Sequence, residues 1–186
     1  MNNQTVRIIG GKWRGRKLHF PQLPGLRPTP DRVKETLFNW LMFDIVDRRC
    51  LDLYAGSGAL GLEAYSRGAK TVVLVEQQVE AVAQLRKTLV QLEAEQEVQV
   101  VHANALSWLK SNASAAFDVI FLDPPFKAEL LLPSLHALKE HGWVGADSLI
   151  YVEFAEGTQV TMLESQWHIL KRKKMGAVEC ALIKLI

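Results

Sequence analysis

The segment CLDLYAGSGALG, residues 50–61, joins a short apolar run to a glycine-rich turn. The apolar part predicts a buried strand, and residues 59–67 are typical of a helix that ends at Gly68. Gly56 to Gly61 match the pattern G-x-G-x-x-G, in which glycines allow a tight turn and a close approach of a ligand to the backbone. The segment therefore predicts the first strand–turn–helix unit of an α/β fold.

The chain beyond this segment continues to alternate between strand-like and helix-like patterns. We expect helices at 78–92, 106–110 and 130–139, separated by strands at 71–75, 98–101, 119–122 and 149–152. This alternation is typical of a parallel sheet with helices on both faces. Residues 167–174 and 177–183 predict a terminal antiparallel hairpin, which would complete a mostly parallel sheet of seven strands.

The N-terminal part of the chain follows a different pattern. Residues 5–9 and 12–20 predict two strands of a hairpin around Gly10-Gly11, and the proline-rich residues 21–30 predict a linker. Asp31 is expected to cap a helix from Arg32 to about Phe43. We therefore divide the chain into a basic hairpin and linker extension, residues 1–30, and a main domain, residues 31–186.

Charge is distributed unevenly along the chain, although the net charge is only +2. The segment from Met1 to Trp40 holds eight basic and only two acidic residues, so the remainder of the chain has an acidic excess. The basic residues alternate with glycines and Trp13, which favours contact with a polyanion over a solvated charged arm. Trp13 itself could stack on a ligand or pack the hairpin. Lys171 to Lys174 form a second basic run, which a strand would divide between two faces.

Polar residues fall at or near the carboxyl ends of four predicted parallel strands: Asp52, Glu76, Asn104 and Asp123. In open α/β sheets, ligands bind at this edge. Glu76 follows the glycine turn at the spacing of a ribose-binding acid, and it can accept hydrogen bonds from the two hydroxyls of a ribose. These features favour a nucleoside ligand over a purely structural turn.

Asp52 bears on which nucleoside binds. A carboxylate at this point would repel a pyrophosphate and would suit a ligand with a positive end, such as S-adenosylmethionine. In a second interpretation, which is compatible with the first, Asp52 accepts hydrogen bonds from the amides of the glycine turn. A nicotinamide-dependent oxidoreductase would fit the glycines, but it would leave the basic extension and residues 123–126 unexplained.

Residues 123–126, Asp-Pro-Pro-Phe, end the apolar run at 119–122. The prolines cannot continue a strand, and they preset the backbone direction. The Asp123 carboxylate and the Pro124 carbonyl could hold the two hydrogens of an amino group, and Phe126 could stack on a base. A strand terminator of purely structural role is the alternative, which the glycine turn and Glu76 disfavour. Whether Asp123 also accepts the released proton stays open.

The combination of DLYAGSG at 52–58, Glu76 and DPPF at 123–126 resembles class I S-adenosylmethionine-dependent methyltransferases that act on exocyclic amino groups. The segments RIIGGKWRGRKL at 7–18 and LRPTPDRVKETLFNWL at 26–41 further resemble the RsmD family. These are bacterial guanine-N2 methyltransferases of small-subunit ribosomal RNA. The resemblance covers the chain from Arg7 to the terminal hairpin.

The resemblance implies a Rossmann-like fold and methyl transfer from S-adenosylmethionine to the N2 amino group of a specific guanine in 16S ribosomal RNA, with S-adenosylhomocysteine as product. It implies a catalytic tip made of Asp123, Pro124, Pro125 and Phe126. The cofactor site would comprise Asp52, Tyr54, Gly56, Ser57, Gly58, Gly61, Glu76, Asn104 and Ala105. RNA would contact the basic residues Arg7, Lys12, Arg14, Arg16, Lys17, Arg27 and Arg32. The target guanine must be unpaired or extruded, because N2 is paired in a helix.

The sequence also limits other classes of function. A DNA adenine-N6 methyltransferase would normally need a target-recognition insert, and none is evident; a non-catalytic RNA-binding assembly factor remains an alternative. The five histidines show no metal-ligand spacing, so we expect no metal, and Cys50 and Cys180 are expected to be buried free thiols. No signal peptide or run of about 20 apolar residues is evident, so a cytoplasmic protein with no membrane partner is expected. The resemblance implies action on the small ribosomal subunit or a late assembly intermediate, and we expect a monomer.

Overall fold

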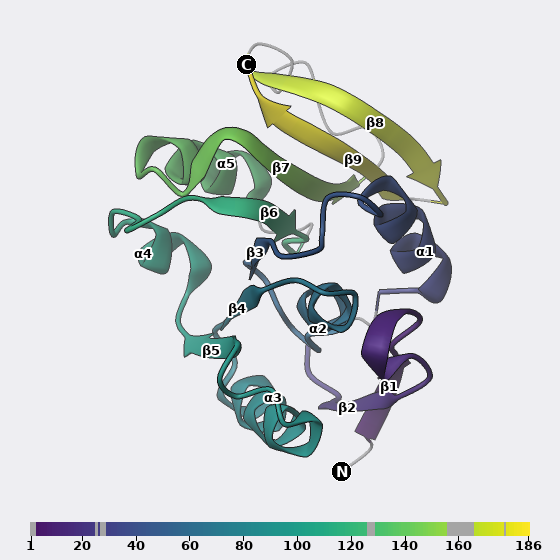
Figure 1. The fold of residues 1–186 in the computed structure, drawn as a ribbon. Coiled ribbons are helices and arrows are strands. Elements are labelled where there is room, and N and C mark those ends of the chain that lie inside the picture. The colour runs from purple at the N-terminus through teal and green to yellow at the C-terminus, as the bar shows by residue number, and fades with distance from the viewer. Residues whose placement is uncertain (1–2, 25, 27–28, 126–128, 156–165, 177) are drawn as a thin grey trace.

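A seven-stranded sheet forms the centre of the computed structural model, which describes residues 3–24, 26, 29–125, 129–155, 166–176 and 178–186. Its strand order is β5-β4-β3-β6-β7-β9-β8, and Figure 1 shows its layers. Neighbouring strands from β5 to β7 run parallel, whereas β9 pairs antiparallel with both β7 and β8. The strands are β3 (Arg49–Asp52), β4 (Thr71–Glu76), β5 (Val98–His102), β6 (Phe117–Leu122), β7 (Val144–Ala155), β8 (Trp167–Met175) and β9 (Val178–Leu185).

Helices cover both faces of this sheet (Figure 1). One face carries α1 (Asp31–Trp40), α2 (Ala59–Ser66) and α3 (Val79–Leu92), and the other carries α4 (Ala105–Leu109) and α5 (Leu131–Glu140). Strand residues alternate between two apolar cores: Phe121 and Tyr151 belong to the core under α1, whereas Ile120 and Val152 belong to the core under α5. This is the predicted class I methyltransferase architecture, which the structure confirms.

The N-terminal hairpin consists of β1 (Asn3–Arg7), a short 3-10 helix η1 (Gly11–Trp13) and β2 (Lys17–Pro21). It shares the apolar core of the first face, because Trp13 is buried with its ring 5.2 Å from that of Tyr65 on α2. The Ser66 hydroxyl donates to the Gly10 carbonyl at 2.7 Å and accepts from the Trp13 amide at 2.9 Å. The hairpin is therefore fixed to α2 by side chains of the sheet domain.

Helix α1 does not begin with Asp31 as its N-cap, as was predicted. Pro30 occupies the N-cap position without a side-chain hydrogen bond, and Asp31 is the first helical residue. The Asp31 carboxylate instead binds Arg7 at 2.8 Å and Lys34 at 3.1 Å. Lys34 is almost fully buried and also donates to the Arg7 carbonyl, so α1 is tied to β1. The helix ends at Trp40, earlier than the expected Phe43.

The terminal hairpin changes the length of β7. This strand was expected over 149–152, but it begins at Val144 and continues to Ala155. Its last residues pair with β9, which places Cys180 opposite Glu153 and Glu179 opposite Phe154. Cys50 and Cys180 are free and buried, as predicted. The division of the chain at residue 30 stays a prediction.

Candidate active site

The glycine turn and the Asp-Pro-Pro segment meet where the order of the strands reverses. From β3 the chain first builds β4 and β5 on one side, and then returns to place β6 directly beside β3. Asp52, the last residue of β3, is paired with Phe121, so Asp123 follows two residues beyond that pair. Ligands of open α/β sheets bind at such a reversal, outside the carboxyl ends of the strands.

Two of the glycines have the backbone conformation that favours glycine. Gly56 and Gly58 have φ values of 52° and 76°, in the left-handed region. Gly61 has a packing role, because a Cβ atom there would lie 2.3 Å from Leu74 Cδ2 on β4, and its predicted contact with the cofactor stays a prediction. The turn thus combines a sharp change of direction at Gly56 and Gly58 with a close contact between α2 and the sheet at Gly61.

Asp52 accepts a hydrogen bond from the Gly61 amide at 2.9 Å, as the structural interpretation of this residue predicted. Burial raises the pKa of Asp52 to about 7; the nearby Glu76 charge acts in the same direction, and the Gly61 hydrogen bond opposes it. A cation near this carboxylate would favour its ionised form. The two interpretations of Asp52 remain compatible.

Glu76 is held at the end of β4 by the turn that it faces. Its Oε2 atom accepts from the Gly56 amide at 2.8 Å, and its Oε1 atom accepts from the Gln78 amide at 2.7 Å. A carboxylate oxygen can accept more than one hydrogen bond, so both oxygens retain capacity for a hydroxyl group. Glu76 therefore fixes the glycine turn and can also bind a diol.

The remaining predicted cofactor residues lie around the same edge. Tyr54 is half-buried, and its hydroxyl is 2.8 Å from Ser134 Oγ on α5, so its side chain faces away from α2. Ser57 is buried in the turn. Asn104 caps α4 by accepting from the Ser107 amide at 3.1 Å, and its amide nitrogen donates to Gln77. Ala105, the first residue of α4, is buried beside it.

The segment after β6 presents a carboxylate on a stiff backbone. Asp123 is half-buried, Pro124 is buried and Pro125 is exposed, whereas Phe126 lies outside the described residues. Burial raises the pKa of Asp123 well above its usual value, and the negative charges of Glu153 and Asp52 raise it further. Asp123, just beyond β6, therefore lies within electrostatic reach of Asp52 at the end of β3 and of Glu153 in β7.

Glu153 and Tyr151 were not among the predicted site residues. Both are buried in β7, and the Tyr151 hydroxyl donates to Glu153 Oε1 at 2.8 Å. The signal was present in the sequence, because Glu153 is an acid after a run of strand residues, like Glu76 and Asp123. Its proximity to Asp123 depends on the pairing of β7 with β6, which no local pattern contains.

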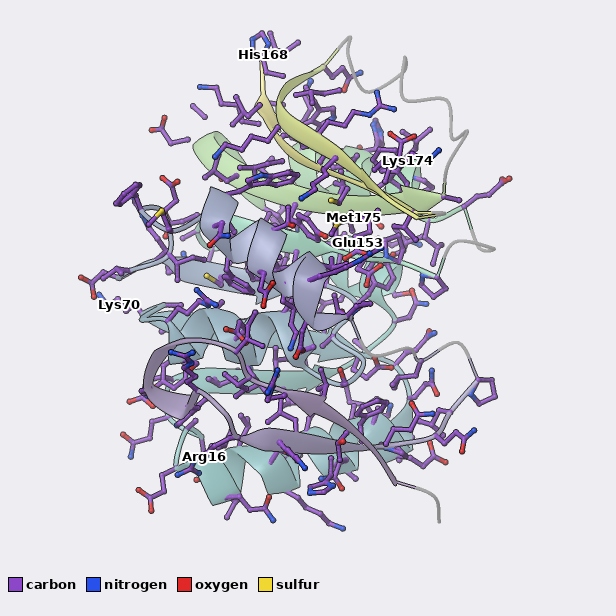
Figure 2. All side chains as sticks on the ribbon, turned by 90° about the vertical axis from the view of Figure 1, so that its right-hand side faces the viewer. Arg16, Lys70, Glu153, His168, Lys174 and Met175 are labelled. Carbon is purple, nitrogen blue, oxygen red and sulfur yellow. The ribbon has the colours of Figure 1, made fainter. Side chains whose placement is uncertain are left out.

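The predicted RNA-binding residues do not form one uniform group. Arg14, Arg16 and Lys17 are exposed on the hairpin, and Figure 2 labels Arg16 on the face that also carries α1. Lys12 lies over the rings of Tyr65 and Trp13, at 3.9 Å and 4.8 Å from their centroids. The list is completed by Arg7, which binds Asp31, by the exposed Arg32 of α1, and by Arg27, which lies outside the described residues.

The described residues include no group of three or more His, Cys, Asp or Glu side chains that could hold a metal ion. Nor does any described helix have the length and apolar character required to span a membrane.

Comparison with known proteins connects this site to a family. The family model described as Conserved hypothetical protein 95 matches residues 6–184. Ribosomal RNA small subunit methyltransferase D of Escherichia coli is 46% identical over 173 residues, covering 93% of this chain and 86% of that protein. This chain belongs to the methyltransferase D family.

Solved structures agree with this membership. A structure described as putative methyltransferase yhhF from Escherichia coli has a TM-score of 0.86 and 44% identity, with 98% of each chain covered. A 16S rRNA N2 methyltransferase of Thermus thermophilus, solved with AdoMet and guanosine, has a TM-score of 0.75 at 22% identity. It is matched over 100% of this chain and 50% of that one, and at this identity it supports the fold alone. The methyltransferase D family is thus the family that the sequence resemblance had indicated.

Proposed function

We propose that this protein transfers a methyl group from S-adenosylmethionine to the N2 amino group of a guanine in small-subunit ribosomal RNA. The observation that carries the proposal is the position of Asp123-Pro124-Pro125 directly after β6, the strand beside β3, which leads into the glycine turn. Asp123, an acceptor for amino hydrogens, and the glycine turn, which suits a nucleoside, thus lie side by side at the carboxyl ends of β6 and β3. No other part of the described chain combines these two features.

The residues around the turn suit S-adenosylmethionine. Glu76 can accept the two ribose hydroxyls with the lone pairs that the Gly56 and Gln78 amides leave available. The buried Asp52 carboxylate offers a negative charge to the sulfonium and ammonium groups, whereas a pyrophosphate would be repelled. When bound, the cofactor supplies an electrophilic methyl group.

Asp123 and Pro124 would hold the acceptor. The guanine amino group is a weak nucleophile, because its lone pair is delocalised into the ring, so its orientation toward the methyl group dominates the task. The Asp123 carboxylate and the Pro124 carbonyl can each accept one amino hydrogen. The proline rings restrict φ to a narrow range at positions 124 and 125, which presets the direction of the carbonyl. Phe126 is proposed to stack on the base.

The basic hairpin is proposed to hold the RNA backbone. Arg14, Arg16 and Lys17 are exposed on a hairpin that Ser66 and Glu63 fix to α2, so their charges are presented from a rigid base. Arg7 and Arg32 lie near the start of α1, between the hairpin and the terminal strands. Lys12 is available only if it leaves its position over the Tyr65 ring.

The nature of the substrate is inferred from relatives. The Escherichia coli relative is named as a methyltransferase of the small ribosomal subunit RNA. The Thermus thermophilus structure is described as an N2 methyltransferase of 16S rRNA and contains guanosine. The name of the Escherichia coli relative supports ribosomal RNA as the substrate, whereas guanine N2 is proposed as the acceptor because the Asp123 carboxylate and the Pro124 carbonyl can hold an amino group. The structural context of that RNA is proposed to be the small subunit or a late assembly intermediate.

Methyl transfer with labelled S-adenosylmethionine tests the proposal. The protein is incubated with unmethylated 16S rRNA, with assembled small subunits lacking the modification, and with DNA, and the modified nucleoside is identified after digestion. We expect label in N2-methylguanosine from one of the two RNA substrates. Label in N6-methyladenine of DNA would indicate the DNA methyltransferase alternative. RNA binding without any label would indicate the assembly-factor alternative, and either result would refute the proposal.

A further inference from the structure

Glu153 lies beside Asp123 on the neighbouring strand. Strands β6 and β7 are parallel, with Phe121 paired to Tyr151 and Leu122 paired to Val152. Asp123 directly follows the last pair of this register, and Glu153 continues β7 beyond it, where neighbouring strands lie about 4.8 Å apart. Side chains alternate along a strand, so Glu153 lies on the face of Tyr151, which packs under α1, and its charge acts on Asp123.

Glu153 is an acid at a buried strand position, where an apolar residue would normally be found. It is 6% exposed, and the hydroxyl of the fully buried Tyr151 donates to its Oε1 atom at 2.8 Å. Burying a second acid beside Asp123 costs stability, since like charges in a low dielectric repel one another. A sequence retains such a local conflict mainly at sites of function.

Several charged or titratable groups lie on the elements that neighbour Glu153. The acids of the sheet are Asp123 and Asp52, and the cross-strand partner on β9 is Cys180. Lys173 on β8 lies opposite Cys180, and its ammonium donates to Thr36 of α1 at 3.3 Å. Figure 2 labels Glu153 close to Met175 and Lys174, at the turn between β8 and β9. Helix α1 adds Asp31, Arg32, Lys34 and Glu35, of which Lys34 is bound to Asp31 and to the Arg7 carbonyl.

We propose that Glu153 is a positioning residue for methyl transfer: its carboxylate, held by Tyr151, keeps a negative charge beside Asp123 and thereby makes Asp123 the acceptor of the proton that leaves the target amino group. This inference rests on the proposed function and deepens it, since it assigns the proton acceptor and a residue that acts through it.

The proposed reaction balances with these groups alone. A bond forms between the amino nitrogen and the methyl carbon, and the bond from that carbon to sulfur breaks with its electron pair going to sulfur. The nitrogen loses one proton, which Asp123 accepts. Burial raises the pKa of Glu153, and the Tyr151 hydrogen bond opposes this by stabilising the ionised carboxylate. The Glu153 charge in turn raises the pKa of Asp123, so Asp123 is a stronger base than a solvated aspartate.

The first test is the pH dependence of methyl transfer by Glu153→Gln. The amide can still accept the Tyr151 hydrogen bond, so the fold should be retained, but the charge is lost. The acid limb of the rate profile, where Asp123 becomes protonated, should move to lower pH by about one unit. On the plateau above this limb the rate should fall by no more than about tenfold, because the base is weaker by about one unit, while affinity for S-adenosylhomocysteine changes little. Glu153→Asp should restore most of the wild-type profile, and Glu140→Gln, an exposed acid on α5, should leave it unchanged.

The second test uses the unliganded protein and does not depend on activity. NMR of isotope-labelled aspartate carboxyl groups, assigned with Asp123→Asn, should give a lower midpoint for Asp123 in Glu153→Gln than in the wild type. If Glu153→Gln does not fold, Tyr151→Phe provides the comparison, because loss of the hydroxyl raises the pKa of Glu153 further and favours its neutral form. The rate loss of that variant should then shrink as the pH is raised.

Three results would overturn the inference. The first is an unchanged Asp123 midpoint in Glu153→Gln. The second is an unchanged acid limb in that variant. The third is a loss of cofactor affinity without any change in the pH profile, which would make Glu153 a ligand contact. If the wild-type protein transfers no methyl group, the proposed function fails, and the NMR midpoint still decides whether Glu153 controls Asp123.

Discussion

Glu76 on β4 accepts a 2.8 Å hydrogen bond from the backbone amide of Gly56, in the turn that precedes α2. The same carboxylate accepts from the Gln78 amide at 2.7 Å. The acid proposed to bind the ribose therefore also shapes the turn that would surround the cofactor. Binding and local structure are coupled at this residue.

Replacing Glu76 tests this coupling. Glu76→Ala should reduce affinity for S-adenosylhomocysteine by at least about tenfold, and loss of acceptors for two amides should lower the free energy of unfolding by about 1–3 kcal/mol. Calorimetric titration and urea unfolding measure the two effects. Glu80→Ala, an exposed acid on α3, is the matched control. Wild-type affinity in Glu76→Ala would remove this residue from the cofactor site.

The raised pKa of Asp52 predicts a dependence of stability on pH. Its pKa is about 7 in the folded protein and close to 4 in an unfolded chain, so the folded state binds more protons between these values. Stability contributed by this group therefore falls as the pH rises from about 4 to about 7. Asp52→Asn should gain stability relative to the wild type between pH 5 and pH 8, by up to about 4 kcal/mol.

Urea unfolding of both proteins at several pH values measures this difference. Asp147→Asn, at an exposed position of β7, should show no comparable trend. A stability difference between Asp52→Asn and the wild type that does not vary with pH would contradict the assigned ionisation of Asp52.

Ser66 is expected to hold the hairpin in place for RNA. Its hydroxyl bonds both the Gly10 carbonyl and the Trp13 amide, so Ser66→Ala leaves two backbone groups without this partner. We expect a loss of about 1–3 kcal/mol in stability, faster proteolysis within the hairpin and weaker RNA binding. Cofactor affinity should be retained. Ser111→Ala, which alters an exposed hydroxyl after α4, serves as control. Unchanged RNA affinity with a loosened hairpin would show that rigidity is not required.

The exposed charges of the hairpin make a separate prediction. Charge reversal at Arg14 and Arg16 should weaken RNA binding and flatten its dependence on salt, by about 0.7–0.9 in the logarithmic slope for each lost phosphate contact. Filter binding at several salt concentrations measures this slope. The control is charge reversal at Lys70 and Lys87, which are exposed outside the hairpin, because this double variant has the same net charge as the first. Equal losses in the two double variants would indicate a general charge effect rather than a hairpin contact.

Periodicity and turn residues were sufficient to predict the sheet and its helices. The glycine turn, the strand-end acids and the terminal hairpin all lie where local pattern placed them, because each depends on short-range chemistry. The end of β7 was wrong, since its final residues are strand only through pairing with β9. Pairing between distant segments leaves no local signal.

The polar contacts of the site were harder to predict from the sequence. Asp31 looked like a helix cap, but its carboxylate joins Arg7 and Lys34 instead. Gly61 was predicted as a cofactor contact, and its packing role became visible only from the proximity of Leu74. The association of Glu153 with Asp123 needs the register of β6 against β7, which no local pattern contains.

The amount of N2-methylguanosine formed by Asp123→Ala tests the central claim most directly. Wild-type protein and variant are compared on the same unmethylated small-subunit RNA substrate with labelled S-adenosylmethionine, after equal affinity for S-adenosylhomocysteine has been verified. We expect wild-type label in N2-methylguanosine and a loss of about 100-fold or more in the variant, because the acceptor of the amino hydrogens is removed. Equal label from both proteins, or no N2-methylguanosine from the wild type, would contradict the account.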